Sequence, residues 1–296
     1  MAAVPDSAVA ERPVRRPPGW ISGRRPPRPT DHWDLRRALT RLIPPLLFAI
    51  LVLGIWELYV SVSGIHESTL PPPSKIASAL WDNRSLLISN GWVTVKEILL
   101  GFVVAVVVGV SLAVAVSTSR IVELAVYPWL VISQTVPVPA IAPIFVVWTG
   151  FDIRPKVMVI ALVTFFPIVV NTVDGLKSTD PELLDLLRTL GASRWRQFRV
   201  AKFPAALPFL FSGLKVAAVF SVIGAVFGEW VGASSGLGYL ILTYNQQTAT
   251  TAMFATVVAL SLIGIALFFV VAVLERLALP WYHDARRGQT LAGAAR

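Results

Sequence analysis

Residues that could carry out catalysis or hold a metal ion are sparse in this chain of 296 residues. The absence of cysteine excludes disulfides and thiolate metal sites. The three histidines, His32, His66 and His283, are too widely separated in the sequence to suggest a shared metal site. The sequence Gly-x-x-x-x-Gly-Lys-[Ser/Thr], which forms a phosphate-binding loop, does not occur. We therefore expect no catalytic residue, metal or cofactor, and we do not expect the chain to be an enzyme.

The composition is that of a helical membrane protein. Hydrophobic residues make up 55% of the chain, charged residues only 15%, and the mean hydropathy is +0.69. A soluble protein usually carries more charge, and several apolar runs reach the roughly 18 residues needed to cross a bilayer. We predict an all-α fold with about six transmembrane helices. The predicted spans are residues 43–63, 97–117, 123–148, 156–176, 205–228 and 254–279.

The distribution of basic residues predicts the orientation. With both termini inside, 20 of the 26 Lys and Arg residues fall in inner segments and 5 in outer segments, while Lys215 lies within a span. Because cytoplasmic loops of membrane proteins are enriched in Lys and Arg, this bias predicts cytoplasmic N- and C-termini. This enrichment of cytoplasmic segments in basic residues explains the net charge of +9. We therefore predict a lipid membrane rather than nucleic acid as the partner.

The chain divides into three predicted segments. Residues 1–42 are rich in Pro and Arg and contain nine arginines, so they are expected to form a disordered cytoplasmic tail. Residues 43–282 form the transmembrane domain, and residues 283–296 form a cytoplasmic C-terminal tail. In the outer loop after the first span, residues 74–92 are expected to form an amphipathic surface helix.

A conspicuous charged loop, residues 177–204, separates the fourth and fifth predicted spans. Asp180 is suited to cap a helix, and Pro181 is suited to its first turn. Gly191 is expected to end or bend this helix, and a second short basic segment, residues 193–202, follows. Two short helices with a bend form a rigid body that can insert into a groove on a partner protein, whereas an ordinary connecting loop is the simpler alternative.

The loop resembles the EAA loop of ABC-transporter permeases, which docks on the ATPase subunit. The family pattern falls on Asp185-Leu186-Leu187, Gly191, Ala201, Phe203 and Pro204. The chain departs from the pattern by Asp in place of Glu at 185 and by Leu at both Ala positions. The residues that the resemblance implies for contact with the ATPase are Asp185, Leu187, Gly191, Ala192, Arg194, Arg196, Phe198 and Pro204.

Polar and helix-breaking residues within the predicted spans are candidates for a substrate pathway. Pro137, like the prolines at 139 and 143, removes a backbone donor, so the third span is expected to be a broken helix lining a pathway or simply a kinked helix. Gln134 and Asn171 are further polar candidates. Glu229, at the outer end of the fifth span, faces either the pathway or the membrane interface.

Residues from about 70 to 282 resemble the permease family that serves nitrate, taurine, aliphatic sulfonates and thiamine precursors. The resemblance rests on LPPPSKIASAL, on the prolines of the third span, and on FPIVVNT and SSGLGYLI. The segments VIGAVFGEWVGASSGLGYLI and LERLALPW look most like the branch that imports a thiamine pyrimidine precursor or riboflavin. Import of a sulfonate, taurine or nitrate is the alternative substrate class.

The resemblance also implies the partners of the chain. These are a second permease copy in a homodimer, a separate ABC ATPase dimer and an extracytoplasmic substrate-binding protein, in a bacterial inner membrane. A rival class is a secondary transporter driven by an ion gradient, which would require embedded charged relays or inverted repeats.

Overall fold

In the computed structural model, the backbone is described for residues 35–282, and the side chains are described for residues 43–282. Helix α1 (Leu35–Ser63) begins inside the predicted N-terminal tail of residues 1–42. The last part of that segment, from Leu35, is therefore helical, and the cytoplasmic tail stays a prediction. Its remainder, residues 1–34, and the predicted C-terminal tail of residues 283–296 lie outside the described residues.

The chain forms two compact units, Met1–Val52 and Leu53–Arg296. Within the first unit, the described part of α1 is a helix that continues through Pro44 and Pro45 and exposes apolar side chains such as Phe48. Exposed apolar side chains on a long helix are what lipid contact requires. The second unit contains the other helices and the sites described below.

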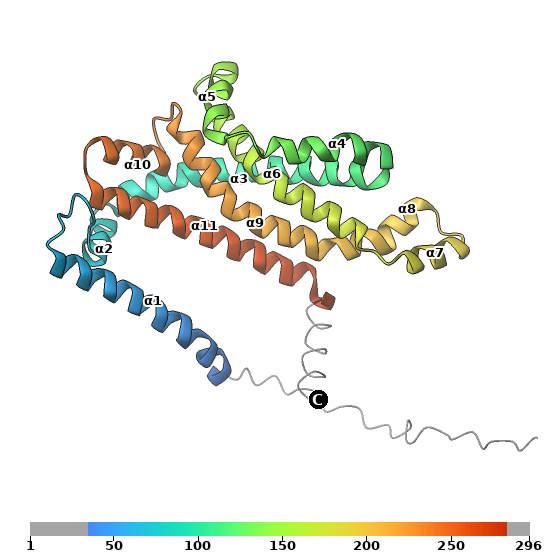
Figure 1. The fold of residues 1–296 in the computed structure, drawn as a ribbon, viewed down its shortest axis with the longest axis horizontal. Coiled ribbons are helices and arrows are strands. Elements are labelled where there is room, and N and C mark those ends of the chain that lie inside the picture. Colours follow the sequence, from blue (N-terminus) through green and yellow to red (C-terminus); the bar gives the residue numbers. More distant parts are fainter. Residues whose placement is uncertain (1–34, 283–296) are drawn as a thin grey trace, which may run out of the picture. The chain divides into compact units, whose positions relative to one another are not determined.

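Every element in the described part of the chain is a helix (Figure 1), which confirms the predicted fold class. Five helical segments are long and apolar enough to cross a membrane, and a sixth span is counted when a bent helix pair is taken as one. The predicted number of about six spans is thus confirmed. The long helices after α1 are α3 (Arg84–Thr118), α6 (Arg154–Lys177), α9 (Phe203–Trp230) and α11 (Thr250–Ala278), and the bent pair is α4 (Arg120–Ser133) with α5 (Val138–Thr149).

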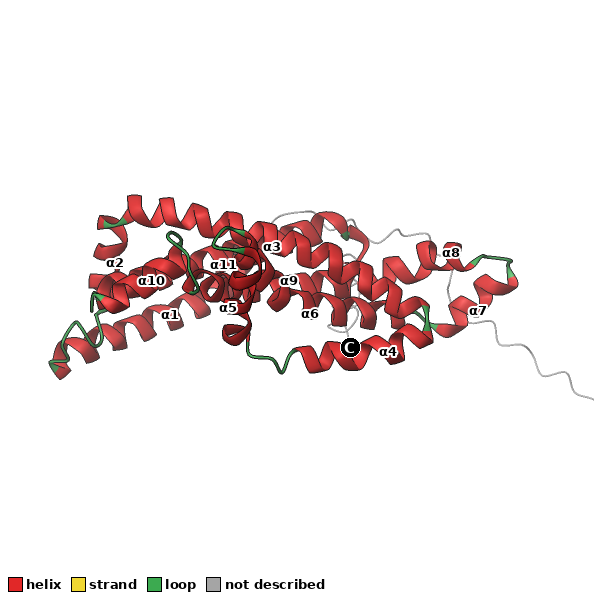
Figure 2. Ribbon diagram, turned by 90° about the horizontal axis from the view of Figure 1, so that it is seen from above, coloured by secondary structure: helices red, strands yellow, loops and turns green. Residues whose placement is uncertain are grey.

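The shorter elements gather at the two ends of these helices. In the second unit, α7 (Pro181–Thr189) and α8 (Arg194–Gln197) lie at one end, while α2 (Pro73–Asp82) and α10 (Leu237–Gln246) lie toward the other (Figures 1 and 2). A π-helical turn, η1 (Phe198–Lys202), joins α8 to α9.

The predicted surface helix of residues 74–92 is corrected. Helix α2 ends at Asp82, and α3 starts at Arg84 and continues as one helix of 35 residues. A single residue, Asn83, separates them, and its side-chain amide donates to the carbonyl of Ala79 at 2.9 Å. The second half of the expected surface helix is therefore the first part of a membrane-length helix.

Helix α6 packs between α3 and α9, and small residues allow the close approach. A Cβ atom added to Gly101 of α3 would lie 2.6 Å from the side chain of Ile160. A Cβ atom added to Gly213 of α9 would lie 2.7 Å from the carbonyl oxygen of Pro167. The buried small residues at four-residue spacing are Gly101, Ala105, Gly109 and Ala113 on α3, and Gly213, Ala217, Ser221 and Ala225 on α9.

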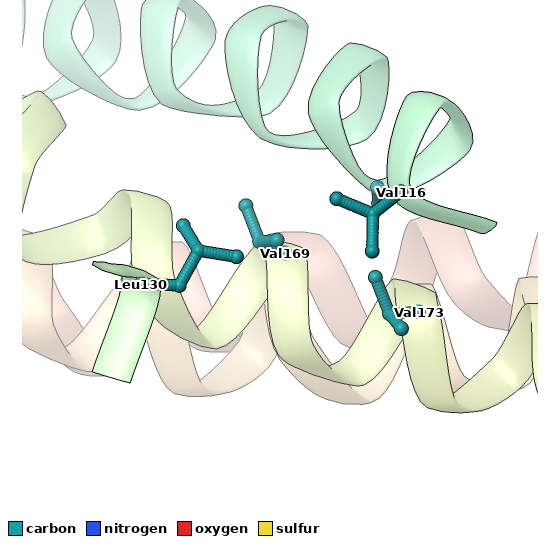
Figure 3. Close-up of a cluster of buried hydrophobic side chains, with 5 residues drawn as sticks. Val116, Leu130, Val169 and Val173 are labelled. Carbon is teal, nitrogen blue, oxygen red and sulfur yellow. The ribbon is translucent and has the colours of Figure 1, made fainter. Parts of the chain in front are cut away.

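A cluster of buried aliphatic side chains attaches α4 to this packed core (Figure 3). Val116 of α3, Leu130 of α4, and Val169 and Val173 of α6 converge, each with 5% or less of its surface exposed. Lipid tails are as apolar as these side chains, so the cluster stabilises the attachment of α4 through close van der Waals packing rather than through removal of apolar surface from water. Leu130 thus holds α4 against α6 one turn before the break that separates α4 from α5.

Candidate functional site

The predicted break in the third span is a sharp bend. The axes of α4 and α5 differ by 102°, and the chain turns between Ser133 and Val138. Pro137 has an extended backbone conformation and occupies the position immediately before α5. A proline has no N–H group and disfavours helical geometry in the preceding residue, which favours a break here. The third span is therefore a broken helix rather than a kinked one, and its role in lining a pathway stays a prediction.

A cavity of about 380 Å³ lies at this bend, and it brings together two of the predicted pathway residues. Gln134, at the end of α4, and Asn171, on α6, both line it. Pro137 does not itself line the cavity, although Val136 and Val138 on either side of it do. The full lining is Ser133, Gln134, Val136, Val138, Leu162, Val163, Phe166, Pro167, Val170, Asn171, Val216 and Phe220.

The wall of this cavity combines apolar surface with a few uncharged polar groups. The side-chain amide of Asn171 donates to the carbonyl of Pro167 at 2.8 Å, which leaves its Oδ1 atom as an acceptor. Pro167 also lacks the N–H that would bond to the carbonyl of Val163, another lining residue. The lining contains no Asp, Glu, Lys or Arg. Such a surface suits a neutral or weakly polar small molecule.

The pathway role of Glu229 stays a prediction, and the structure gives its side chain a structural role. Its side chain is 1% exposed and lies at the end of α9, where it does not line the cavity at the bend. One carboxylate oxygen, Oε1, accepts a hydrogen bond from Thr94 at 2.7 Å. The other, Oε2, accepts from the backbone N–H groups of Gly238 and Tyr239 at 2.6 and 3.2 Å. Glu229 therefore caps the N-terminus of α10.

Two side chains of α3 complete this cap. Asn90 accepts from the N–H of Gly236 at 2.8 Å, and Thr94 accepts from the N–H of Leu237 at 2.9 Å. The first N–H groups of a helix have no partner within the helix and require one from elsewhere. Four successive N–H groups at the start of α10 are thus satisfied by side chains of α3 and α9.

The backbone conformation of Gly236 explains why a glycine stands immediately before α10. Its φ of +118° is a conformation that favours glycine, and a Cβ atom there would collide with the carboxylate of Glu229. Gly236 and Gly238 therefore allow a carboxylate to approach the backbone closely. Sequence reasoning missed this role because no local pattern relates Glu229 to an N–H group ten residues later.

Two ion pairs within the helices, one buried and one partly buried, were also missed from the sequence. Lys156 of α6 pairs with Glu97 of α3 at 2.7 Å, and Lys215 of α9 pairs with Glu275 of α11 at 2.8 Å. Partners of this kind are what embedded charges require.

At the opposite end of the second unit, the loop of residues 177–204 folds into two short helices. The Asp180 side chain accepts from the N–H of Glu182 at 2.9 Å, and Pro181 occupies the first turn of α7, as predicted. Gly191 adopts a φ of +75°. The N–H groups of Gly191 and Ala192 donate to the carbonyls of Arg188 and Leu187, both at 2.9 Å. This pair of bonds is a Schellman motif, in which glycine at this position ends a helix.

The second half of the loop is tied to this bend. Gln197 of α8 is buried and donates to the carbonyl of Ala192 at 2.9 Å. Phe198 stacks on Trp195 with ring centroids 5.6 Å apart. Pro204 occupies the first turn of α9. The loop is therefore a compact body continuous with α9.

The surface of this loop is exposed and partly apolar. Leu186, Leu190 and Trp195 are 56%, 74% and 69% exposed. The other predicted coupling residues lie at or near the surface of the loop. Asp185 is exposed and pairs with Arg188 at 2.7 Å. Leu187 and Ala192 are half-buried, and Arg194 and Arg196 are exposed.

A packed set of membrane-length helices, a neutral cavity at a broken span and an exposed loop with apolar side chains define the membrane subunit of a transporter. The chain belongs to the family of binding-protein-dependent transport system inner membrane components, whose profile matches residues 105–280. It is therefore a permease subunit of an ABC transporter, and subunits of this family are not themselves enzymes. The secondary-transporter alternative is not supported.

Relatives with named substrates match most of the chain. The formylaminopyrimidine transport permease protein ThiX of Halalkalibacterium halodurans is 41% identical over 240 residues, which cover 81% of this chain and 96% of that protein. The riboflavin transport system permease protein RibX of Chloroflexus aurantiacus is 36% identical over 233 residues, which cover 78% and 87%. Permeases for aliphatic sulfonates and taurine match at 25–28% identity.

A solved structure supports the fold. A chain of the inward-facing MetNI methionine ABC transporter matches with a TM-score of 0.59 at 19% identity, over 66% of this chain and 97% of that chain. Family membership implies a membrane location and a need for ATPase and binding-protein partners.

Proposed function

We propose that this permease imports a small neutral aromatic compound, either a pyrimidine precursor of thiamine or riboflavin. The observation that carries the proposal is the cavity at the bend between α4 and α5. Its volume, about 380 Å³, falls in the range of small-molecule sites. Its uncharged amide groups, Gln134 and Asn171, offer donors and acceptors to a heteroaromatic ring, and its apolar walls suit the faces of that ring.

The charge distribution supports a neutral substrate over the alternative of a sulfonate, taurine or nitrate. An anion would call for an unpaired cation along its path. Lys156 and Lys215, the described lysines of the four long helices that are not exposed, are each paired with a glutamate, whereas Lys96 of α3 is exposed beside Trp92. The relatives with pyrimidine and flavin substrates also match at higher identity than the sulfonate and taurine permeases.

We propose further that two copies of the chain form a homodimer with the pathway between them, and that both termini are cytoplasmic. A separate ATPase dimer hydrolyses ATP, and an extracytoplasmic binding protein delivers the substrate. The loop of residues 177–204 docks on the ATPase. Its exposed Leu186, Leu190 and Trp195 support this role, because aromatic and aliphatic anchors dominate interfaces of this kind.

The contacts also suggest how movement of the loop reaches the cavity. The loop is continuous with α9 through the π-helical turn η1. Gly213 of α9 packs directly against Pro167 and Asn171 of α6, and both of these residues line the cavity. A displacement of α9 by the ATPase would therefore move the cavity wall, since packed interfaces do not deform continuously.

The experiment compares growth of two bacterial strains that express the complete transport system. One strain requires a thiamine pyrimidine precursor or riboflavin, and the other depends on an alkanesulfonate or taurine as its sulfur source. We expect rescue of the first strain only, and loss of that rescue when the partner ATPase is inactivated. Rescue of the sulfur-limited strain alone would overturn the substrate proposal.

A further inference from the structure

A cluster of three ionisable side chains is buried where α3, α6, α9 and α10 meet. Glu97 and Lys156 form an ion pair in which their side chains are 2% and 11% exposed. Glu229 is 1% exposed and caps α10. None of the three lines the cavity at the bend, so substrate binding does not account for them.

One oxygen of this cluster lacks a donor. Oε1 of Glu97 accepts from Lys156, but Oε2 is buried with no hydrogen-bond partner. Glu229 lies close to this ion pair: its Oε1 accepts from Thr94, which is one turn before Glu97 on α3, and the neighbouring Gly228 packs against the Cα atom of Lys156. Two ionised carboxylates cannot bond to each other, because both groups are acceptors only, whereas a protonated carboxyl group is a donor.

The balance of charge in the cluster also favours a protonated carboxyl group. From the helices packed together here, α3 contributes Glu97, α6 contributes Lys156 and α9 contributes Glu229, while α10 contributes the backbone N–H groups of Gly238 and Tyr239. With both acids ionised, the cluster has two negative charges against one positive charge. A buried charge without compensation is strongly unfavourable, and one additional proton would neutralise the cluster.

We propose that Glu97 and Glu229 form a proton-binding site, in which one proton is shared between the two carboxyl groups and Lys156 remains an ammonium ion. The shared proton supplies the missing donor for Oε2 of Glu97 and removes the excess negative charge. The remaining charge on the acid pair is balanced by Lys156.

The proton site is linked to the placement of α10. Glu229 holds the N–H groups of Gly238 and Tyr239 while it shares the proton with Glu97. Loss of the proton would leave two buried carboxylates beside a single lysine, and a movement of Glu229 would relieve their repulsion. Such a movement would release the N–H groups of Gly238 and Tyr239 from α9, whereas the side chains of α3 would still hold the two preceding N–H groups.

Infrared spectroscopy of the purified importer in lipid tests the proton directly. At neutral pH we expect the carbonyl stretch of a protonated carboxyl group, shifted by exchange into D₂O, and we expect it to disappear in both Glu97→Gln and Glu229→Gln. Glu57→Gln is the matched control, because Glu57 bonds to Ser74 outside the cluster and should leave the signal unchanged. Absence of the signal in the wild type, or its persistence in both cluster variants, overturns the proposal.

A second measurement tests the link to α10 and uses the absence of native cysteine. Leu240 of α10 is 6% exposed, so a Leu240→Cys reporter should react slowly with a thiol reagent. In Glu229→Gln the amide can donate to Glu97 and accept from α10, which imitates the protonated pair and should keep the reporter protected. In Glu229→Ala we expect labelling to be about tenfold faster or more, because charge-assisted hydrogen bonds to α10 are lost. Equal labelling in the two variants contradicts the link.

Discussion

Replacement of Gly191 by leucine tests whether the shape of the loop transmits ATP-driven movement. Gly191 has a φ of +75°, and a Cβ atom there would meet nothing within 4 Å. The cost of a side chain is therefore backbone strain alone, which is about 1–2 kcal/mol for a left-handed residue. If the residue relaxes to a right-handed conformation, the two hydrogen bonds of the Schellman motif are lost, at about 1 kcal/mol each.

This cost is large for the loop because little else holds its shape. None of the residues of α7 is buried, and α7 has only nine residues, so its packing and helix propensity offer little compensation. A change of about 1–2 kcal/mol lowers the ratio of the docking conformation to competing conformations by a factor of roughly 5–30. We expect transport by Gly191→Leu to fall by up to this factor while the protein remains in the membrane.

The assay measures substrate uptake, the amount of permease in the membrane and co-purification of the ATPase. Gly64→Leu is a matched control, because Gly64 has a φ of +63°, is equally open, and lies just beyond α1 rather than in the loop. Gly191→Asn should retain more transport, since asparagine tolerates the left-handed conformation. Normal uptake and co-purification by Gly191→Leu would refute the argument.

Three further substitutions test the packing, the cavity and the buried charges. Gly213→Leu should lower the thermal stability of the permease by forcing α9 away from α6, whereas Gly54→Leu, where a Cβ would meet nothing within 4 Å, should not. Asn171→Leu should weaken uptake through a higher KM without reducing the amount of protein in the membrane, as saturation curves and immunoblots will reveal. Lys215→Met should lower the melting temperature by leaving Glu275 unpaired, and the double variant Lys215→Met/Glu275→Leu should recover part of the loss.

The sequence predicted features that depend on local chemistry. Gly191 signalled the end of a helix, and Pro137 signalled a break, because each residue restricts the backbone wherever it occurs. The number of spans followed from the length of apolar runs. The prediction that Gln134 and Asn171 are polar pathway candidates stays a prediction, but the structure brings both residues to one cavity.

Features that depend on long-range contacts could not be predicted in this way. The bond between Thr94 and Glu229 joins residues 135 positions apart, and the pair of Lys215 and Glu275 joins residues 60 apart. The N-terminal part of α3 was mistaken for part of a surface helix because of polar residues such as Asn90. Their polar side chains accept hydrogen bonds from the start of α10 inside the protein. This role becomes visible only when α3 is seen packed against α10.

Helix α9 connects the loop of residues 177–204, the cavity at the bend and the cap of α10. This connection constrains any transport mechanism. The helical segment from Arg194 to Trp230 contains 37 residues, which at about 1.5 Å per residue extends for about 55 Å. It begins in the exposed loop, contacts the wall of the cavity at Gly213, and ends beside the cap of α10 at Glu229. Because close packing on α6 leaves α9 little freedom to bend alone, a force on the loop must displace both helices or neither. Movement of the loop is thus coupled to the cavity and to the cap of α10 at Glu229.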